Sequence, residues 1–247
     1  MSSHTGALQA VLFDMDGLLV DSEPGWHKVV VELVTELGGV WTPADARAIV
    51  GSALIDSARR MVAVAASNAP PEQVVLAMVA AMEVTLRRGV TWRPGARELL
   101  AELAEAGVPT ALVSASFRVL VDAVCSHLGA APFAVTVAGD EVRRGKPDPE
   151  PYLTACAGLG VDPAYAVVLE DSLTGAAAGE AAGCLVVGVP HVVALTPTAR
   201  RRVVDSLAGL SVASLAAFVR TGELPAARRS PDRRASIGNE AISPSRS

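Results

Sequence analysis

The hydrophobic residues of this 247-residue chain follow two patterns that alternate along most of its length. Short apolar runs have the length and composition of buried strands, whereas longer stretches repeat apolar residues every three or four positions, as helices do. Strands are predicted near 10–13, 109–113, 133–138, 165–169 and 184–189, with helices between them at 96–106, 117–128, 149–158 and 173–182. This alternation is typical of an α/β fold with a doubly wound parallel sheet, a Rossmann-like core.

Residues 24–90 break the alternation, because only helical patterns follow the first strand there. Helices are predicted from Trp26 to Leu37, from Thr42-Pro43, and near 54–66 and 72–88. We therefore expect a core formed by residues 1–22 and 91–225, and a small all-helical cap domain at 23–90 inserted after the first strand. Residues 226–247 are polar and rich in Arg and Ser, so we expect a disordered tail.

The charge distribution bears on the class of partner. The formal net charge is −5, but the tail carries five arginines against Asp232 and Glu240, a net +3, which leaves −8 for residues 1–225. A body this acidic argues against nucleic acid as the main partner. An anionic substrate would then need a local positive site.

Composition also indicates the compartment. Hydrophobic residues make up 51% of the chain, yet no run is long enough to cross a membrane. The N-terminus, MSSHTGALQA, lacks a basic region followed by an apolar core, so we expect no signal peptide and a cytoplasmic protein. The sequence has no feature that indicates the oligomeric state, and a monomer is preferred. Cys125, Cys156 and Cys184 are widely spaced in apolar segments, which favours buried thiols over a disulfide framework or a zinc cluster.

Two carboxylates directly follow the first predicted strand. Asp14 and Asp16 point the same way if the chain stays extended, and Gly17 then turns it. Parallel strands present ligand-binding groups at their carboxyl ends, where this pair would lie. Two carboxylates so close repel each other unless a cation neutralises them or one is protonated, so a hard metal ion, an acid/base pair or both are indicated. An ordinary Asp-Gly turn is the alternative.

Three further sites have the same character. Ser114-Ala115-Ser116 follows the second strand and precedes a helix, which suits a phosphate site or a simple helix cap. Lys146 lies in a loop stiffened by prolines, although a lone Lys is usually solvated. Glu170-Asp171 ends the fourth strand and could merely cap the next helix.

Taken together, the order and placement of these motifs resemble the haloacid dehalogenase superfamily, specifically its phosphatase and phosphomutase branch with a helical cap. The resemblance covers roughly residues 8–222, and FDMDGLLVDSEP, GKPDPEPY and LEDS are its most specific segments.

The resemblance implies that Asp14 is the nucleophile and forms an aspartyl-phosphate, with Asp16 as general acid and base. It implies Mg²⁺ bound by the Asp14 carboxylate, the Asp16 backbone carbonyl and Asp171, with Glu170 as a ligand directly or through water. Such an ion would offset the repulsion between these carboxylates and a phosphate dianion.

The resemblance also implies that Ser114, the Ala115 amide and Lys146 hold the phosphoryl oxygens. Because Asp16 is present, phosphoryl transfer is favoured over dehalogenation. Overall it implies magnesium-dependent hydrolysis of a small phosphate monoester, with a sugar phosphate as the expected substrate.

The residues of the cap segment help to distinguish a phosphatase from a mutase. The β-phosphoglucomutase type has a His in the first cap helix, where this chain has Trp26 beside His27, and an Arg and a Lys deeper in the cap, which 52–56 and 72–82 lack. DSEPGW is more similar to sugar-phosphate phosphatases, so a phosphatase is preferred, with a sugar phosphomutase as the alternative. A non-catalytic module that binds a phosphorylated ligand is the alternative of another class. Glu23, Trp26 and Ser52 are the candidate substrate contacts in the cap.

Overall fold

One parallel sheet forms the centre of the protein. The computed structural model describes residues 7–49, 52–129 and 132–225, so the tail predicted at 226–247 lies outside the described residues. The strands lie in the order β3-β2-β1-β4-β5-β6, and every neighbouring pair is parallel. Their bounds are β1 Ala10–Phe13, β2 Thr110–Val113, β3 Val135–Val137, β4 Ala166–Glu170, β5 Leu185–Gly188 and β6 Arg201–Val203. The predicted doubly wound sheet is confirmed, with the edge strand β6 in addition.

Helices cover both faces of the sheet because alternate strand residues point to opposite sides. On one face, residues such as Leu12 pack against α7 (Glu150–Leu159) and α8 (Leu173–Ala181). On the other face, residues such as Phe13 pack against α5 (Ala96–Glu105), α6 (Arg118–Cys125) and α9 (Val212–Thr221). Two short 3₁₀ turns, Gly139–Glu141 and Pro163–Tyr165, complete the connections.

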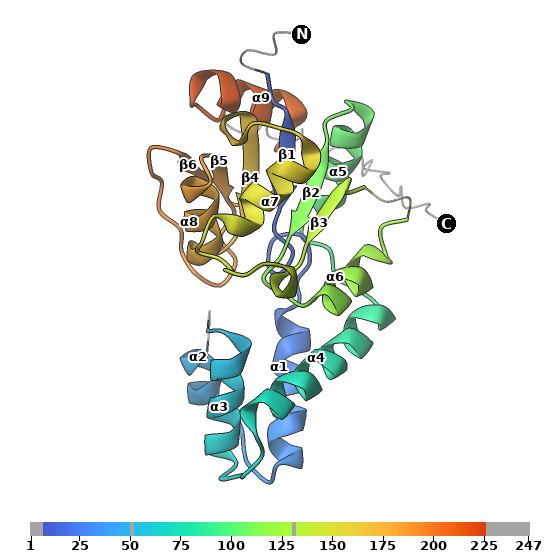
Figure 1. The fold of residues 1–247 in the computed structure, drawn as a ribbon, viewed down its shortest axis with the longest axis vertical. Helices are drawn as coiled ribbons and strands as arrows, with labels where there is room; N and C mark the ends of the chain where they lie inside the picture. The colour runs from blue at the N-terminus through green and yellow to red at the C-terminus, as the bar shows by residue number, and fades with distance from the viewer. Residues whose placement is uncertain (1–6, 50–51, 130–131, 226–247) are drawn as a thin grey trace, which may run out of the picture.

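Of the five helices described between β1 and β2, the first four pack on one another beside the sheet, in the lower part of Figure 1. They are α1 Glu23–Glu36, α2 Pro43–Ala48, α3 Leu54–Val64 and α4 Pro71–Arg88. Thr42 caps α2 as predicted, since its side chain accepts a hydrogen bond from the Asp45 amide. Across the described residues, no helix combines the length and the apolar character needed to span a bilayer.

Candidate active site

The strand order reverses at β1, which has β2 on one side and β4 on the other. In open parallel sheets, ligands bind outside the carboxyl ends of the strands at such a reversal. Asp14 follows β1 directly, Glu170 is the last residue of β4, and Asp171 comes next. The Asp14 amide donates to the Leu169 carbonyl over 3.0 Å, which holds the two strand ends together. Carboxylates far apart in sequence thus meet at the edge of the sheet.

Gly17 allows the chain to leave this edge. Its φ of +84° is strained for other residues, and its amide donates to the Val20 carbonyl over 2.8 Å to close the turn. A Cβ atom at this position would also overlap the Asp171 carboxylate. Gly17 is therefore needed both for the turn and for the close approach of Asp171.

Lys146 reaches the edge from the loop before α7. Its Nζ donates to Asp14 Oδ1 over 2.6 Å, to Glu170 Oε1 over 2.7 Å and to the Val113 carbonyl over 2.9 Å. The side chain is only 4% exposed, so this ammonium is not the solvated lysine of the alternative interpretation. Burial by itself would lower the pKa of Lys146, but the carboxylates of Asp14 and Glu170 outweigh it and raise the pKa above its ordinary value.

Glu170 is fully buried, and both of its oxygens accept hydrogen bonds. Oε1 accepts from Lys146 and from the Tyr152 hydroxyl over 2.9 Å, and Oε2 accepts from the Ser172 amide and hydroxyl over 3.0 and 2.9 Å. Ser172, rather than the Glu170-Asp171 pair, caps α8. Glu170 thus anchors Lys146 while remaining beside Asp14.

Asp16 lies in a different hydrogen-bond network. Its Oδ1 accepts from Ser22 over 2.6 Å, and its Oδ2 accepts from Ser116 over 2.8 Å and from Ser114 over 3.4 Å. The residue that caps α6 is Phe117, without a side-chain hydrogen bond, so neither serine acts as the cap. Three hydroxyls therefore hold the Asp16 carboxylate in place.

The carboxylates of Asp14, Glu170 and Asp171 form a group that could hold a cation. One oxygen from each lies within 4.8 Å of the others. Asp14 Oδ2 is buried and has no hydrogen-bond partner in the described residues. Burial, then the charge of Glu170, raise the pKa of Asp171 to about 7, and burial raises the pKa of Asp14 as well. A hard divalent ion such as Mg²⁺ fits this oxygen-only set.

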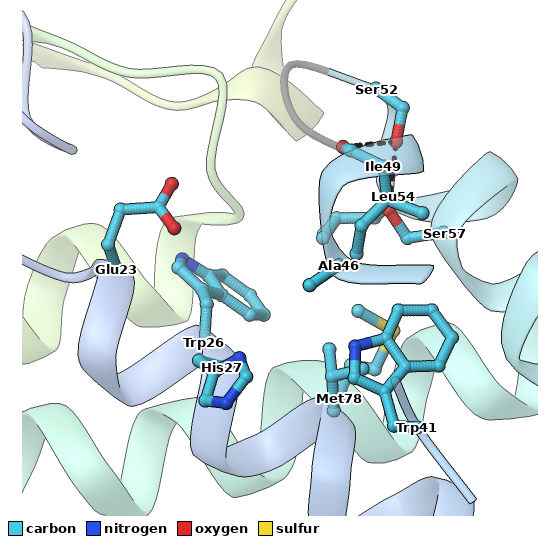
Figure 2. Close-up of a pocket in the computed structure, with 11 residues that line it drawn as sticks. Glu23, Trp26, His27, Trp41, Ala46, Ile49, Ser52, Leu54, Ser57 and Met78 are labelled. Atoms are coloured by element: carbon cyan, nitrogen blue, oxygen red, sulfur yellow. Dashed lines mark hydrogen bonds between the residues drawn. The ribbon is translucent and has the colours of Figure 1, made fainter. Parts of the chain in front are cut away.

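A cavity of about 500 Å³ opens over these groups. Among the residues predicted for the site, it is lined by Asp14, Asp16, Ala115, Lys146, Asp171, Glu23 and Ser52. Ser114 and Glu170 lie behind this surface, at 2% and 0% exposure. A second cavity, of about 260 Å³, lies among the cap helices and includes Trp26 in its lining (Figure 2).

Sequence reasoning missed several polar side chains that support the site. Tyr152 belongs to the GKPDPEPY motif, and its position three residues after Pro149 offers a weak signal for a buried hydroxyl. Ser22 and Ser172 directly follow the acidic residues Asp21 and Asp171. From the sequence alone, both serines would be interpreted as helix caps. His191, from the loop after β5, has a buried Nδ1 without a partner among the described residues, and no pattern pointed to it.

Comparisons with known proteins agree with this geometry. The chain is 32% identical over 182 residues to validoxylamine A 7'-phosphate phosphatase of Streptomyces hygroscopicus subsp. limoneus, covering 73% of this chain and 85% of that protein. It is 34% identical over 179 residues to hexitol phosphatase A of Escherichia coli K12, covering 72% and 81%. The crystal structure of CbbY from Rhodobacter sphaeroides in complex with phosphate superposes with a TM-score of 0.72 at 28% identity, covering 81% and 95%.

A family model described as haloacid dehalogenase-like hydrolase matches residues 8–183, which is most of the sheet and all of the helices inserted after β1. Since this match covers most of the chain and includes Asp14, Asp16, Lys146, Glu170 and Asp171, the chain belongs to the haloacid dehalogenase-like hydrolases.

Proposed function

We propose that the protein hydrolyses a small phosphate monoester, a sugar or polyol phosphate, through an aspartyl-phosphate on Asp14. The observation that carries this proposal is the position of Asp14 at the strand reversal, facing the cavity with Lys146 at 2.6 Å. Two similar proteins are named as phosphatases of a validoxylamine phosphate and of hexitol phosphates, which supports a polyhydroxylated leaving group.

In the proposed reaction, an Asp14 carboxylate oxygen forms the bond to phosphorus while the ester P–O bond breaks. Asp16 gives its proton to the departing alkoxide and later removes a proton from the water that attacks the phosphorylated Asp14. This second step releases inorganic phosphate and restores both carboxyl groups. The serine hydroxyls on Asp16 hold it in one orientation for both proton transfers.

Lys146 provides a positive charge for the phosphoryl oxygens, and the Ala115 amide provides a hydrogen-bond donor. Glu170 keeps the ammonium of Lys146 in place, so its charge is directed to the phosphate before the substrate arrives. Asp14, Asp171 and the Asp16 carbonyl would hold Mg²⁺, with Glu170 beside them. When bound, this ion would neutralise the carboxylates and draw charge from the transferring phosphoryl group.

Hydrolysis is tested first with a generic ester. We expect the purified protein to release p-nitrophenol from p-nitrophenyl phosphate in Mg²⁺ and to lose this turnover in excess EDTA. Circular dichroism should remain unchanged in EDTA, because the apolar core does not depend on the ion. Turnover that continues in the chelator would contradict the role of Mg²⁺, and no turnover with any ester would favour the non-catalytic binding module.

A further inference from the structure

The cap cavity shown in Figure 2 shares two lining residues with the catalytic cavity. Glu23 and Ser52 line both. A leaving group that extends from a phosphate at Asp14 past Glu23 would enter the cap cavity, a space of about 260 Å³ among the cap helices. A space of this size is large enough for a group beyond the carbon that bears the phosphate, so its lining should select the leaving group.

The formally charged side chains that line the two cavities are mostly acidic. Among the described residues, Glu23 is the only Asp, Glu, Lys or Arg that lines the cap cavity, which His27 also lines, and Lys146 is the only Lys or Arg that lines the catalytic one. Lys146 is already paired with Asp14 and Glu170. Within the cavity, Glu23 has neither a hydrogen bond nor an ion pair from the described residues (Figure 2).

An indole ring lies next to this carboxylate. Trp26 follows Glu23 by three residues on α1, so both side chains project from the same side of the helix. Figure 2 shows the Trp26 indole between Glu23 and the α2–α3 residues Ala46 and Leu54, with Trp41 farther along the cavity. A carboxylate beside indole rings is the arrangement that binds ammonium groups in proteins, by ion pairing and by attraction to the ring faces.

Resting on the proposed function, we infer that the preferred leaving group carries a protonated amine, as in an amino sugar or amino polyol phosphate, and that Glu23 binds this amine. A hydroxyl would gain less from the Glu23 carboxylate, since hydrogen bonds between two charged partners are stronger. A second phosphate or a carboxylate would be disfavoured beside Glu23, because His27 is the only side chain of the described cap-cavity lining that could oppose it with a positive charge. Trp26 would cover the ammonium with its ring.

The inference is tested with matched pairs of esters that differ by one amine. We would measure kcat/KM in Mg²⁺ for glucosamine 6-phosphate against glucose 6-phosphate, and for 6-aminohexyl phosphate against hexyl phosphate. The two pairs place the amine at different distances from phosphorus. We expect at least one amine to be preferred by about tenfold or more, the size expected for one additional charged hydrogen bond.

The variant Glu23→Gln should bring this preference to about one, because the amide keeps the size of the side chain and removes its charge. Glu32→Gln is the matched control, since Glu32 lies on the same helix, is exposed and lines neither cavity. It changes the net charge equally and should keep the wild-type preference.

The outcomes separate this inference from the proposed function. Hydrolysis of p-nitrophenyl phosphate with no amine preference in either pair would overturn the inference alone. An amine preference that survives in Glu23→Gln would also overturn it, because another group would then hold the amine. No hydrolysis of any ester, including p-nitrophenyl phosphate, would overturn the proposed function and the inference with it.

Discussion

Glu170 is the residue on which the geometry of the site depends. It is charged, has 0% exposure, and makes hydrogen bonds to Lys146, Tyr152 and Ser172. A buried carboxylate is tolerated only when its oxygens are satisfied in this way. Each of these partners therefore contributes both to stability and to the placement of the ammonium beside Asp14.

Replacing Tyr152 by Phe should remove one hydrogen bond from this buried carboxylate. We expect the free energy of unfolding to fall by about 1.5–3 kcal/mol, the usual value for a lost hydrogen bond to a charged group. Urea titration measures this change. Tyr165→Phe is the control, because Tyr165 is only partly buried and should change stability by less than about 0.5 kcal/mol. Equal losses of unfolding free energy in the two variants would show that the hydrogen bond from Tyr152 to Glu170 contributes no additional stability.

Replacing Asp14 by Asn should abolish turnover, because a neutral amide does not attack phosphorus and binds a cation poorly. We expect kcat to fall at least about a thousandfold, as for other catalytic nucleophiles. Steady-state assays with a generic aryl phosphate measure the loss, and circular dichroism verifies the fold. A variant that kept a tenth of the wild-type kcat would rule out this nucleophile.

The sequence predicted the reactive side chains of the site better than it predicted the side chains that hold them in place. Asp14, Lys146 and Asp171 follow strands or stiff loops in recognisable motifs, and the structure brings them together. Tyr152 was missed because helical spacing shows that a residue is buried, but not which polar atom its hydroxyl meets. A contact between residues 18 positions apart depends on how α7 packs against β4.

At the scale of elements, α8 approaches the site unusually closely. Gly175 lies in its first turn, and a Cβ atom there would overlap the Glu170 carboxylate. A larger residue would force either α8 or Glu170 to move. The small residues at the start of α8 thus allow the helix to press against the end of β4.

Gly175→Ala should therefore lower both stability and kcat, even though alanine favours helices. We expect a loss of about 1–3 kcal/mol from overpacking and a fall in kcat of about tenfold or more as Lys146 loses its anchor. Gly89→Ala serves as the control, because a Cβ atom at Gly89 meets no atom within 4 Å. A Gly175→Ala protein with wild-type kcat would show that Glu170 does not need its present position.

Most elements were predicted from periodicity, but two near the end of the described chain were not. β6 is the three-residue edge strand Arg201–Val203, RRV, which lacks the apolar run expected of a buried strand. α9 carried a readable signal, since Ser211 caps its start and Gly222, in a left-handed conformation, ends it. Short edge strands owe their conformation to the neighbouring strand, which the sequence does not show.

At the scale of the whole molecule, the two cavities together decide between hydrolysis and mutase chemistry. A mutase must hold a bisphosphate and let it reorient, which calls for cations on the second phosphate. Among the residues that the structure describes, Lys146 is the only Lys or Arg that lines either cavity. Without such cations, water should reach the phosphorylated Asp14 once the alcohol has left.

We therefore expect glucose 1-phosphate, with a trace of glucose 1,6-bisphosphate, to yield free phosphate and glucose rather than its isomer. Parallel assays of phosphate and of glucose 6-phosphate over time measure the two outcomes, and omission of the bisphosphate should not slow phosphate release. If glucose 6-phosphate accumulated with little phosphate, the phosphomutase alternative would be correct.

The position of β1 in the sheet also has a consequence for biosynthesis. β1 is made before the other described strands of the sheet, yet one of its two neighbours, β4, begins only at Ala166, about 150 residues later. At the usual elongation rates of about 5–20 residues per second, this delay lasts roughly 8–30 s. Until β4 has emerged, β1 has at least one edge open to strands of other nascent chains. The strand that presents Asp14 at the edge of the sheet is thus made early, and its second neighbour arrives only after this long delay.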